Sequence, residues 1–321
     1  MMKALVRHKF GSHEIVRVEE VARPQLPDDR VLVRVRASSI NKADFHALEG
    51  SPFLGRFLMR NGVLRPKNPL FGSDIAGVVE AVGANVHDLA VGDEVFGGGP
   101  GGYAEYVAAK FVVEKPANVT FEDASTMGIA ALTALQGLRD KGGLKPGDRV
   151  LINGASGGVG TMAIQIAKAL GGNVTAVVGP RNLERARELG ADRVIDRTQE
   201  NFTRGGERYD LVLDVAGGHS WGALRRTLSP KGRVVLVGGH AHRAMLLHLA
   251  ELFLASRIRR GGTLIFFITK WDNDDLRTLA GMLESGQLKP AIDATYELTN
   301  AKEAFRAYAD GHVRGKLVLT M

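Results

Sequence analysis

The sequence contains no cysteine among its 321 residues. This absence excludes disulfide bonds, thiolate nucleophiles and any zinc or iron–sulfur centre held by cysteine. Aromatic residues are also few, at 6%, whereas hydrophobic residues reach 45% and charged residues 24%. This balance is typical of a globular protein with ample core material, so a disordered chain is not expected.

Long hydrophobic runs are missing as well. The first 22 residues alternate charged with apolar residues and contain no continuous apolar segment, so they do not resemble a signal peptide. The longest apolar stretch, residues 244–258, is too short to span a membrane and contains His248, Glu251 and Arg257. These absences predict a cytoplasmic protein with no membrane partner.

The excess of positive charge is modest, with 42 Lys and Arg against 35 Asp and Glu. Such an excess attracts anionic ligands, but no dense basic run with interleaved aromatic residues marks a nucleic-acid site. The tightest basic group, Arg257, Arg259 and Arg260, is typical of a solvated helix end, with ligand steering as the alternative. We therefore expect a small-molecule substrate and no nucleic-acid partner.

The length exceeds the size at which one core usually keeps growing, so two domains are expected. The first third predicts short strands separated by Gly, Pro and Asp, at residues 3–7, 31–37, 75–82, 94–96 and 104–107. From residue 149 strands alternate with helices, which is the pattern of a parallel sheet covered on both faces. A domain boundary near residue 120 is consistent with this change.

Six strands are predicted in the second part, at residues 150–153, 174–178, 194–195, 210–215, 233–237 and 262–268. Helices follow the first two, and Gly190 stands where glycine commonly closes a helix. Beyond the sixth strand, helices near residues 276–283 and 301–308 and a strand at 316–320 do not continue the repeat. We expect this tail to return to the first domain.

A glycine-rich turn joins the first of these strands to its helix. Residues 153–160 read Asn-Gly-Ala-Ser-Gly-Gly-Val-Gly, which places glycines at 154, 157 and 160. The tight turn and the close backbone approach require residues without Cβ, and the free N–H groups at the helix start bind a pyrophosphate. In this strand–turn–helix context the turn predicts a dinucleotide site; alone, it would be equally compatible with a structural loop.

The end of the second strand indicates which dinucleotide is bound. Proteins that choose NAD usually carry an acid there to bind the ribose 2′-hydroxyl. Here the sequence reads Val178-Gly179-Pro180-Arg181-Asn182, and no acid is present. Arg181 can pair with a 2′-phosphate, which favours NADPH; the alternative is a solvent-facing arginine at a helix start.

At this point the sequence resembles the zinc-independent, quinone oxidoreductase-like branch of the medium-chain dehydrogenase/reductase superfamily over nearly its whole length. The matching segments are residues 39–44 (Ser-Ile-Asn-Lys-Ala-Asp), 72–79, 91–96, 102–106, 131–134, the glycine turn, 189–192 and Gly315-Lys316. The resemblance implies an α/β protein with a GroES-like β catalytic domain, residues 1–120 and 264–321, and a doubly wound Rossmann NADP(H)-binding domain, residues 121–263. It also implies a coenzyme between the domains and a homodimer whose seam is the sixth strand, residues 264–268.

Zinc-dependent relatives place a cysteine near Asn41, a histidine after Gly72, and a further lobe with four cysteines. This chain has Ser73 after Gly72 and no cysteine, and Asp74 and His46 alone cannot form an ordinary zinc site. No metal is then available to acidify an alcohol. Hydride transfer from NADPH to a quinone or an α,β-unsaturated carbonyl is the expected reaction.

The resemblance places Asn41 and Thr133 beside the nicotinamide and its ribose, as catalytic positioning groups that hydrogen-bond without a proton change. Close relatives commonly carry tyrosine two residues after the aspartate that matches Asp44, and this chain has His46. Histidine could donate to the substrate oxygen, since its unperturbed pKa near 6.5 suits proton delivery around neutral pH; simple pocket lining is the alternative. The predicted coenzyme contacts are Asn41, Thr133, Gly154, Ala155, Ser156, Gly157, Gly158, Val159, Gly160, Gly179, Arg181, Val215, Val237, Gly238, Phe266, Phe267 and Lys316.

Two other functions stay open from the sequence. One is a zinc-free alcohol or carbonyl dehydrogenase, and the other is a protein that binds NADPH without turnover, because a fold does not fix a function.

Overall fold

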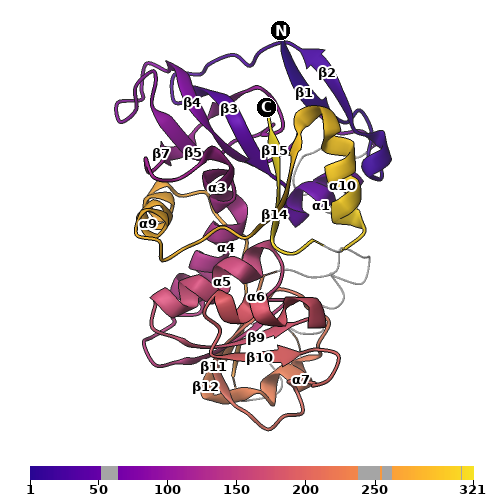
Figure 1. The fold of residues 1–321 in the computed structure, drawn as a ribbon, viewed down its shortest axis with the longest axis vertical. Coiled ribbons are helices and arrows are strands. Elements are labelled where there is room, and N and C mark those ends of the chain that lie inside the picture. Colours follow the sequence, from indigo (N-terminus) through magenta and orange to yellow (C-terminus); the bar gives the residue numbers. More distant parts are fainter. Residues whose placement is uncertain (52–63, 238–253, 255–261, 312) are drawn as a thin grey trace. The chain divides into compact units, whose positions relative to one another are not determined.

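The computed structural model describes residues 1–51, 64–237, 254, 262–311 and 313–321. The chain forms two compact units (Figure 1). Unit 1 comprises Met1–Leu132, Trp271–Gly286 and Pro290–Met321, and unit 2 comprises Thr133–Lys270 and Gln287–Lys289. In the described residues no helix is long and apolar enough to cross a membrane.

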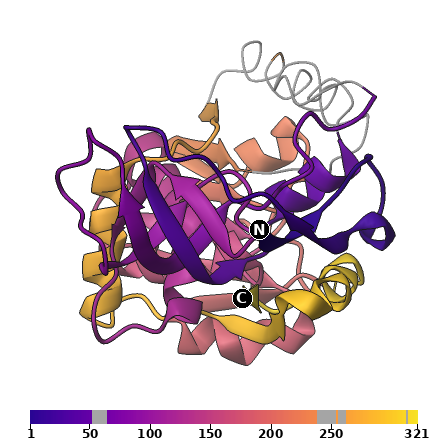
Figure 2. The ribbon, with the colours of Figure 1, turned by 90° about the horizontal axis from the view of Figure 1, so that it is seen from above.

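Unit 1 is built on a seven-stranded sheet. Its path is β14 (Ile292–Glu297), β15 (Lys316–Thr320), β3 (Val31–Ser39), β4 (Asp74–Val82), β5 (Glu94–Gly98) and β7 (Phe111–Glu114), and β6 (Tyr106–Ala109) pairs with β3 off this path. A separate antiparallel pair joins β1 (Met2–Val6) to β2 (Arg17–Val21). The expected return of the tail is confirmed, because β15 pairs with β3, which brings both ends of the chain into unit 1 (Figure 2).

Alternation of side chains explains how this sheet covers its core. In β3, Val31, Val33 and Val35 are buried, whereas Arg34 and Arg36 are exposed, as expected for a strand with one face on the core. Another core cluster of unit 1 is rich in aromatic residues and includes side chains of α1 (Lys42–Glu49) and α10 (Ala301–Ala309). Its rings stack, tilt or meet edge to face at centroid distances of 5.2–5.7 Å, and they belong to Phe45, Phe71, Tyr103, Phe305 and Tyr308.

Further helices of unit 1 are α3 (Phe121–Ser125), the π-helical turn η2 (Met127–Ala131) and α9 (Asn273–Glu284), and η1 (His13–Ile15) and η5 (Leu298–Asn300) are short 3₁₀ turns. The strands β2 and β7 were not predicted from the sequence. Both are short and carry glutamates, Glu19, Glu20 and Glu114, and charged residues are depleted in strands. Their pairing depends on partners elsewhere in the chain.

Unit 2 is a parallel sheet of six strands in the order β10-β9-β8-β11-β12-β13. The strands are β8 (Arg149–Asn153), β9 (Asn173–Val178), β10 (Arg193–Asp196), β11 (Tyr209–Asp214), β12 (Leu228–Leu236) and β13 (Thr263–Phe266). The helices are α4 (Leu132–Leu135), which begins at the unit boundary, π-helical η3 (Gln136–Lys141), α5 (Gly158–Ala169), η4 (Pro180–Asn182), α6 (Leu183–Glu188) and α7 (Trp221–Arg225). This order is the doubly wound arrangement expected of a dinucleotide-binding domain.

The two units differ in extent from the predicted domains. Residues 121–132 belong to unit 1, where α3 packs against β3 and β4. Residues 264–270, which were assigned to the catalytic domain, belong to unit 2, because β13 pairs with β12 from Arg233↔Thr263 to Leu236↔Phe266.

Candidate functional site

The glycine turn of unit 2 lies between β8 and α5. Gly154 has φ +87°, a left-handed conformation that favours glycine. A Cβ on Gly160 would collide with the carbonyl oxygen of Gly154, so this glycine permits close packing of helix on turn. A Cβ on Gly157 would meet only that same oxygen, at 3.9 Å, so Gly157 leaves open space beside the turn.

The helix that follows this turn contributes free N–H groups. The amides of Gly154 and Ala155 both donate to the carbonyl of Val177, at 3.3 and 3.1 Å, and hold the turn on β9. The amides of Gly158, Val159 and Gly160 open the helix, where no carbonyl of a preceding turn can accept them. The turn therefore offers open space and helix-start donors, which fit the pyrophosphate of a dinucleotide.

Most other predicted coenzyme contacts of unit 2 lie at one edge of its sheet. Because all six strands are parallel, their carboxyl ends share that edge. The predicted residues at or just after these ends are Gly179, Val215, Val237, Phe266 and Phe267. Gly238 lies outside the described residues.

One polar pair at this edge was not predicted from the sequence. Asp214, at the end of β11, is 1% exposed and accepts hydrogen bonds from the Asn153 side chain, 2.8 Å, and the Gly217 amide, 2.9 Å. The Asn153–Asp214 bond ties β8 to β11 beside the glycine turn.

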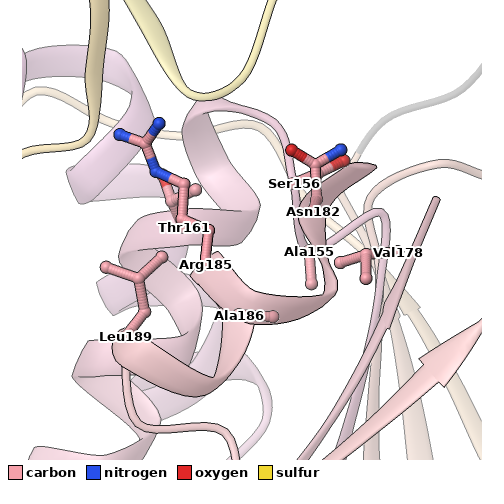
Figure 3. A pocket seen from close by; sticks show the side chains of 8 residues that line it. All are labelled: Ala155, Ser156, Thr161, Val178, Asn182, Arg185, Ala186 and Leu189. Carbon is pink, nitrogen blue, oxygen red and sulfur yellow. The ribbon is translucent and has the colours of Figure 1, made fainter. Parts of the chain in front are cut away.

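The turn after β9 lines a narrow groove, shown in Figure 3, which leaves no room for a water molecule in this structure. Half of its lining residues are apolar, and Ser156, Thr161, Asn182 and Arg185 carry its polar groups. Arg181 lies in η4 of the same turn, is exposed and makes no ion pair with a described carboxylate.

Thr133, the second predicted positioning residue, lies in α4 and is 5% exposed. Its hydroxyl lies 2.6 Å from the hydroxyl of Thr269, just after β13. The next turn of the helix holds the same segment through Gln136, whose amide donates to the carbonyl of Lys270 at 2.8 Å and accepts from its N–H at 3.0 Å. The helix therefore fixes the chain that leaves the carboxyl end of β13.

Asn41, the first predicted positioning residue, lies in a buried polar network of unit 1. Asn41 is the N-cap residue of α1, and its backbone N–H donates to the side chain of Asp44 at 3.0 Å, as in a capping box. Its side-chain amide donates to Asp74 at 2.8 Å, and its carbonyl oxygen accepts from the Lys316 ammonium at 2.5 Å. Both hydrogen-bonding ends of Asn41 are therefore oriented by charged groups.

Asp74 is the centre of this network and is fully buried at the start of β4. Its carboxylate accepts from the Ser39 hydroxyl at 2.7 Å and from the Ile129 amide at 2.8 Å, and lies 3.5 Å from the Lys316 ammonium. A Cβ on Gly128 would collide with this carboxylate, so the chain needs glycine there.

Lys316 was predicted to contact the coenzyme, and in the structure its ammonium lies among polar groups of unit 1. It is 1% exposed, and its ammonium is enclosed by the carbonyl of Ile40, the side chain of Asn41 and Asp74. Burial lowers the pKa of Lys316, and the nearby Asp74 and Asp44 oppose this change.

Asp44 is the second buried carboxyl of the network. It accepts from the hydroxyls of Ser73 and Tyr103, both at 2.8 Å. Burial, and then repulsion by Asp74, raise the pKa of Asp44 to about 6. Ser73 occupies the position at which zinc-dependent relatives place a histidine. In this chain the Ser73 hydroxyl donates a hydrogen bond to Asp44.

His46 lies one half-turn further along α1 and is half-buried. Its Nδ1 is buried without a hydrogen-bond partner in the described structure. Burial, and then the charge of Lys42, lower the pKa of His46 to about 4. The expected pKa near 6.5 is therefore corrected: the ring is neutral at pH 7, and it can donate a hydrogen bond but holds no additional proton.

No signal in the sequence indicated the pairing of Asp74 with Lys316 or the roles of Ser39 and Tyr103. Each of these residues lay in or beside a recognised motif, but a motif does not show which side chains meet. In the described part of the chain, no group of three or more His, Asp or Glu could hold a metal ion.

Comparison with known proteins finds matches to the N-terminal part of the chain, to the C-terminal part and to nearly its whole length. Residues 27–117 match the family model described as alcohol dehydrogenase GroES-like domain, and residues 189–319 match the one described as zinc-binding dehydrogenase. The chloroplastic quinone-oxidoreductase QR1 of Triphysaria versicolor is 33% identical, over 94% of this chain and 92% of that protein. The chloroplastic NADPH-dependent alkenal/one oxidoreductase of Arabidopsis thaliana is 31% identical, over 99% and 79%. The structure of the quinone oxidoreductase from Coxiella burnetii superposes with a TM-score of 0.88 at 29% identity, covering 100% and 99%.

Proposed function

The chain belongs to the quinone oxidoreductase-like branch of the medium-chain dehydrogenase/reductase superfamily, and we propose that it reduces quinones or α,β-unsaturated carbonyl compounds with NADPH and without zinc. The observation that carries the proposal is the open glycine turn at the start of α5, followed at the end of β9 by an arginine and no acid. The bound coenzyme supplies a hydride, and the residues of the chain bind, orient and donate hydrogen bonds.

The test is turnover. Purified protein with NADPH should reduce members of a panel of quinones and enals, and simple aldehydes should be poor substrates. Turnover of aldehydes alone would favour a zinc-free carbonyl dehydrogenase, and tight coenzyme binding without any turnover would favour a binding protein. Either result would contradict the proposed reaction.

Coenzyme choice gives the first prediction. NADPH should bind at least about tenfold more tightly than NADH, which corresponds to about 1.4 kcal/mol, because Arg181 can pair with the 2′-phosphate and no acid repels it. Arg181→Ala should remove most of this preference. Titration of both coenzymes, followed by nicotinamide fluorescence, measures the ratio, and equal affinities in the unaltered protein would show that the phosphate is not recognised.

The absence of zinc gives the second prediction, although one matching family model carries zinc-binding dehydrogenase as its description. A chain without cysteine, in which Ser73 holds Asp44, offers too few ligands for a retained ion. Prolonged treatment with a strong chelator should leave kcat unchanged. Metal analysis of untagged protein checks the same point, and one zinc per chain would contradict the mechanism.

Within the proposed reaction, Asn41 and Thr133 are positioning groups. Asn41 is fixed at both ends of its amide by Asp74 and Lys316, and Thr133 by its hydroxyl contact with Thr269. Neither group changes protonation, so each can orient a carboxamide or hydroxyl without a proton transfer. His46 is proposed as a neutral hydrogen-bond donor to the substrate oxygen, where negative charge develops as the hydride arrives.

We also propose a homodimer joined along β13. Among the described strands β13 pairs only with β12, and Phe266 and Ile268 are 53% and 70% exposed beside its free edge. An apolar strand edge of this kind is a template for pairing with another chain. Ile268→Asp should shift the mass measured by light scattering from dimer to monomer, and a monomeric unaltered protein would contradict the proposal.

The cytoplasmic location remains a prediction from the sequence, and the two curated relatives named above are chloroplastic.

A further inference from the structure

Two buried glutamines of unit 2 each hold the backbone of a distant segment through both ends of the side-chain amide. Gln136, the first residue of η3, donates to the carbonyl of Lys270 at 2.8 Å and accepts from the Lys270 N–H at 3.0 Å. Gln165 in α5 makes the same pair of bonds to Lys289, at 3.0 and 2.8 Å. Both glutamines are 6% exposed. Each contact is a glutamine clamp, because an amide that donates and accepts at once fixes the peptide groups on both sides of the residue it binds.

The two clamped segments differ in what they carry. Lys270 comes directly after Thr269, whose hydroxyl lies 2.6 Å from the hydroxyl of Thr133. Phe267, a predicted coenzyme contact, precedes Lys270 by three residues. The other clamp binds the short segment Gln287–Lys289, which contains no predicted site residue. One clamp therefore acts on a segment of the candidate site, and an equivalent clamp acts on a segment without a proposed role in the reaction.

The helical turn of the first clamp contacts the chain after β13 at a further point. A Cβ on Gly137 would lie 3.1 Å from a methyl group of Leu213 and 3.5 Å from the ring of Phe267. The Phe267 ring therefore lies against the bare backbone of Gly137, one residue after the clamp. Together with the threonine contact and the clamp, this packing holds three of residues 267–270 against residues 133–137. One stretch of helix thus fixes the chain that leaves β13.

We infer that Gln136 is a positioning residue for hydride transfer from the coenzyme, because its clamp holds the segment that orients the Thr133 hydroxyl. This inference rests on the proposed function, in which Thr133 is a positioning group, and deepens it. A threonine hydroxyl rotates until a partner fixes it, and one partner of Thr133 is Thr269. Thr269 shares a peptide group with the clamped Lys270, so loss of the clamp frees this partner as well. A displacement of about 1 Å can lower a reaction rate by about 10²-fold, even when it begins away from the reacting atoms.

The experiment measures the single-turnover rate of NADPH oxidation by the full chain, with one good acceptor at saturation, and the Kd of NADPH. Gln136→Met removes both clamp bonds at nearly constant volume. It should lower the rate about tenfold and change the Kd less than about threefold. Gln136→Glu keeps the acceptor for the Lys270 N–H and should lower the rate by a smaller factor. Both variants should fold, because Lys270 is exposed and water can replace the lost bonds.

Gln165→Met is the matched control, since it removes the same two bonds from an equally buried glutamine, and Lys289 is also exposed. It should lower the Tm about as much as Gln136→Met does and leave the rate within about twofold of the unaltered protein. A second comparison tests the route of the effect. In a Thr269→Val background, Gln136→Met should lower the rate less than about twofold further, because the contact through which it acts is already lost.

An unchanged rate in Gln136→Met, an equal loss in Gln165→Met, or a full further tenfold loss in the Thr269→Val background would each overturn the inference. The proposed function is decided separately, by the acceptors that the unaltered protein reduces. A protein that reduces quinones or enals but fails the Gln136 comparison loses only the inference. One that reduces aldehydes alone, at a rate that depends on Gln136 and not on Gln165, loses only the proposed function, and one that reduces no acceptor loses both.

Discussion

Lys316→Met should lower the free energy of unfolding of unit 1 by about 3–5 kcal/mol, because it leaves Asp74 as an uncompensated charge in the core. Asp74 is fully buried, and Lys316 is the cation that faces its carboxylate, at 3.5 Å. The chain has two tryptophans, Trp221 in unit 2 and Trp271 in unit 1. Urea unfolding of variants in a Trp221→Phe background, followed by Trp271 fluorescence, measures unit 1 by itself.

Two further variants make this result specific. Lys302→Met removes an exposed lysine that pairs with Glu14 at 2.6 Å, and should cost no more than about 1 kcal/mol. Adding Asp74→Asn to Lys316→Met removes the lone buried charge and should recover part of the stability. A loss below about 1 kcal/mol for Lys316→Met would show that Asp74 does not depend on its buried partner.

This ion pair also shows where sequence reasoning reached its limit. The glycine turn could be located because glycines at fixed spacing, between an apolar strand and a helix, form a local pattern. Lys316 and Asn41, by contrast, are 275 residues apart, and their contact exists only because β15 pairs with β3. The resemblance placed Lys316 near the coenzyme, but whether its ammonium faces a ligand or a buried carboxylate is decided by packing.

Among the strands, too, some could be predicted from their own residues, and others form only through pairing with a strand elsewhere in the chain. Residues 31–37 were predicted as one of several short strands separated by Gly, Pro and Asp, which is local information, and β3 covers them. The charged β2 carries Glu19 and Glu20 and forms by pairing with β1, from Met2↔Val21 to Val6↔Arg17. Its local propensity is weak, so only the partner strand makes it a strand.

The pKa of His46 was likewise set by its surroundings. From the sequence alone, only the ordinary pKa of a histidine could be assigned to His46. The structure shows that the ring on α1 is partly buried, and this burial lowers its pKa to about 4. The capping contacts of Asn41 and Asp44 fix the first turn of that helix, so they also fix the place from which His46 projects. A residue that seemed suited to proton transfer near neutral pH is therefore suited to hydrogen bonding as a neutral ring.

If His46 donates a hydrogen bond to the substrate oxygen, His46→Phe should lower kcat by about 10²-fold, the usual cost of losing one donor to a developing negative charge. The affinity for NADPH should stay within about twofold, because the substitution removes no charge from the coenzyme site of unit 2. His46→Gln keeps an N–H donor and should recover part of kcat, whereas a residue that only lines a pocket would not distinguish the two variants.

The pH profile adds an independent measurement of the same role. With a pKa of about 4, His46 is neutral throughout pH 6–8, so its ionisation should produce no inflection in kcat near 6.5. The profiles of the unaltered protein and of His46→Phe should then run parallel across this range, separated by the factor of about 10². Steady-state assays from pH 5.5 to 8.5 on one good quinone substrate measure both curves. Equal kcat values for the two proteins would remove His46 from the mechanism, and an inflection near 6.5 that disappears in His46→Phe would show that the ring acts as a charged acid.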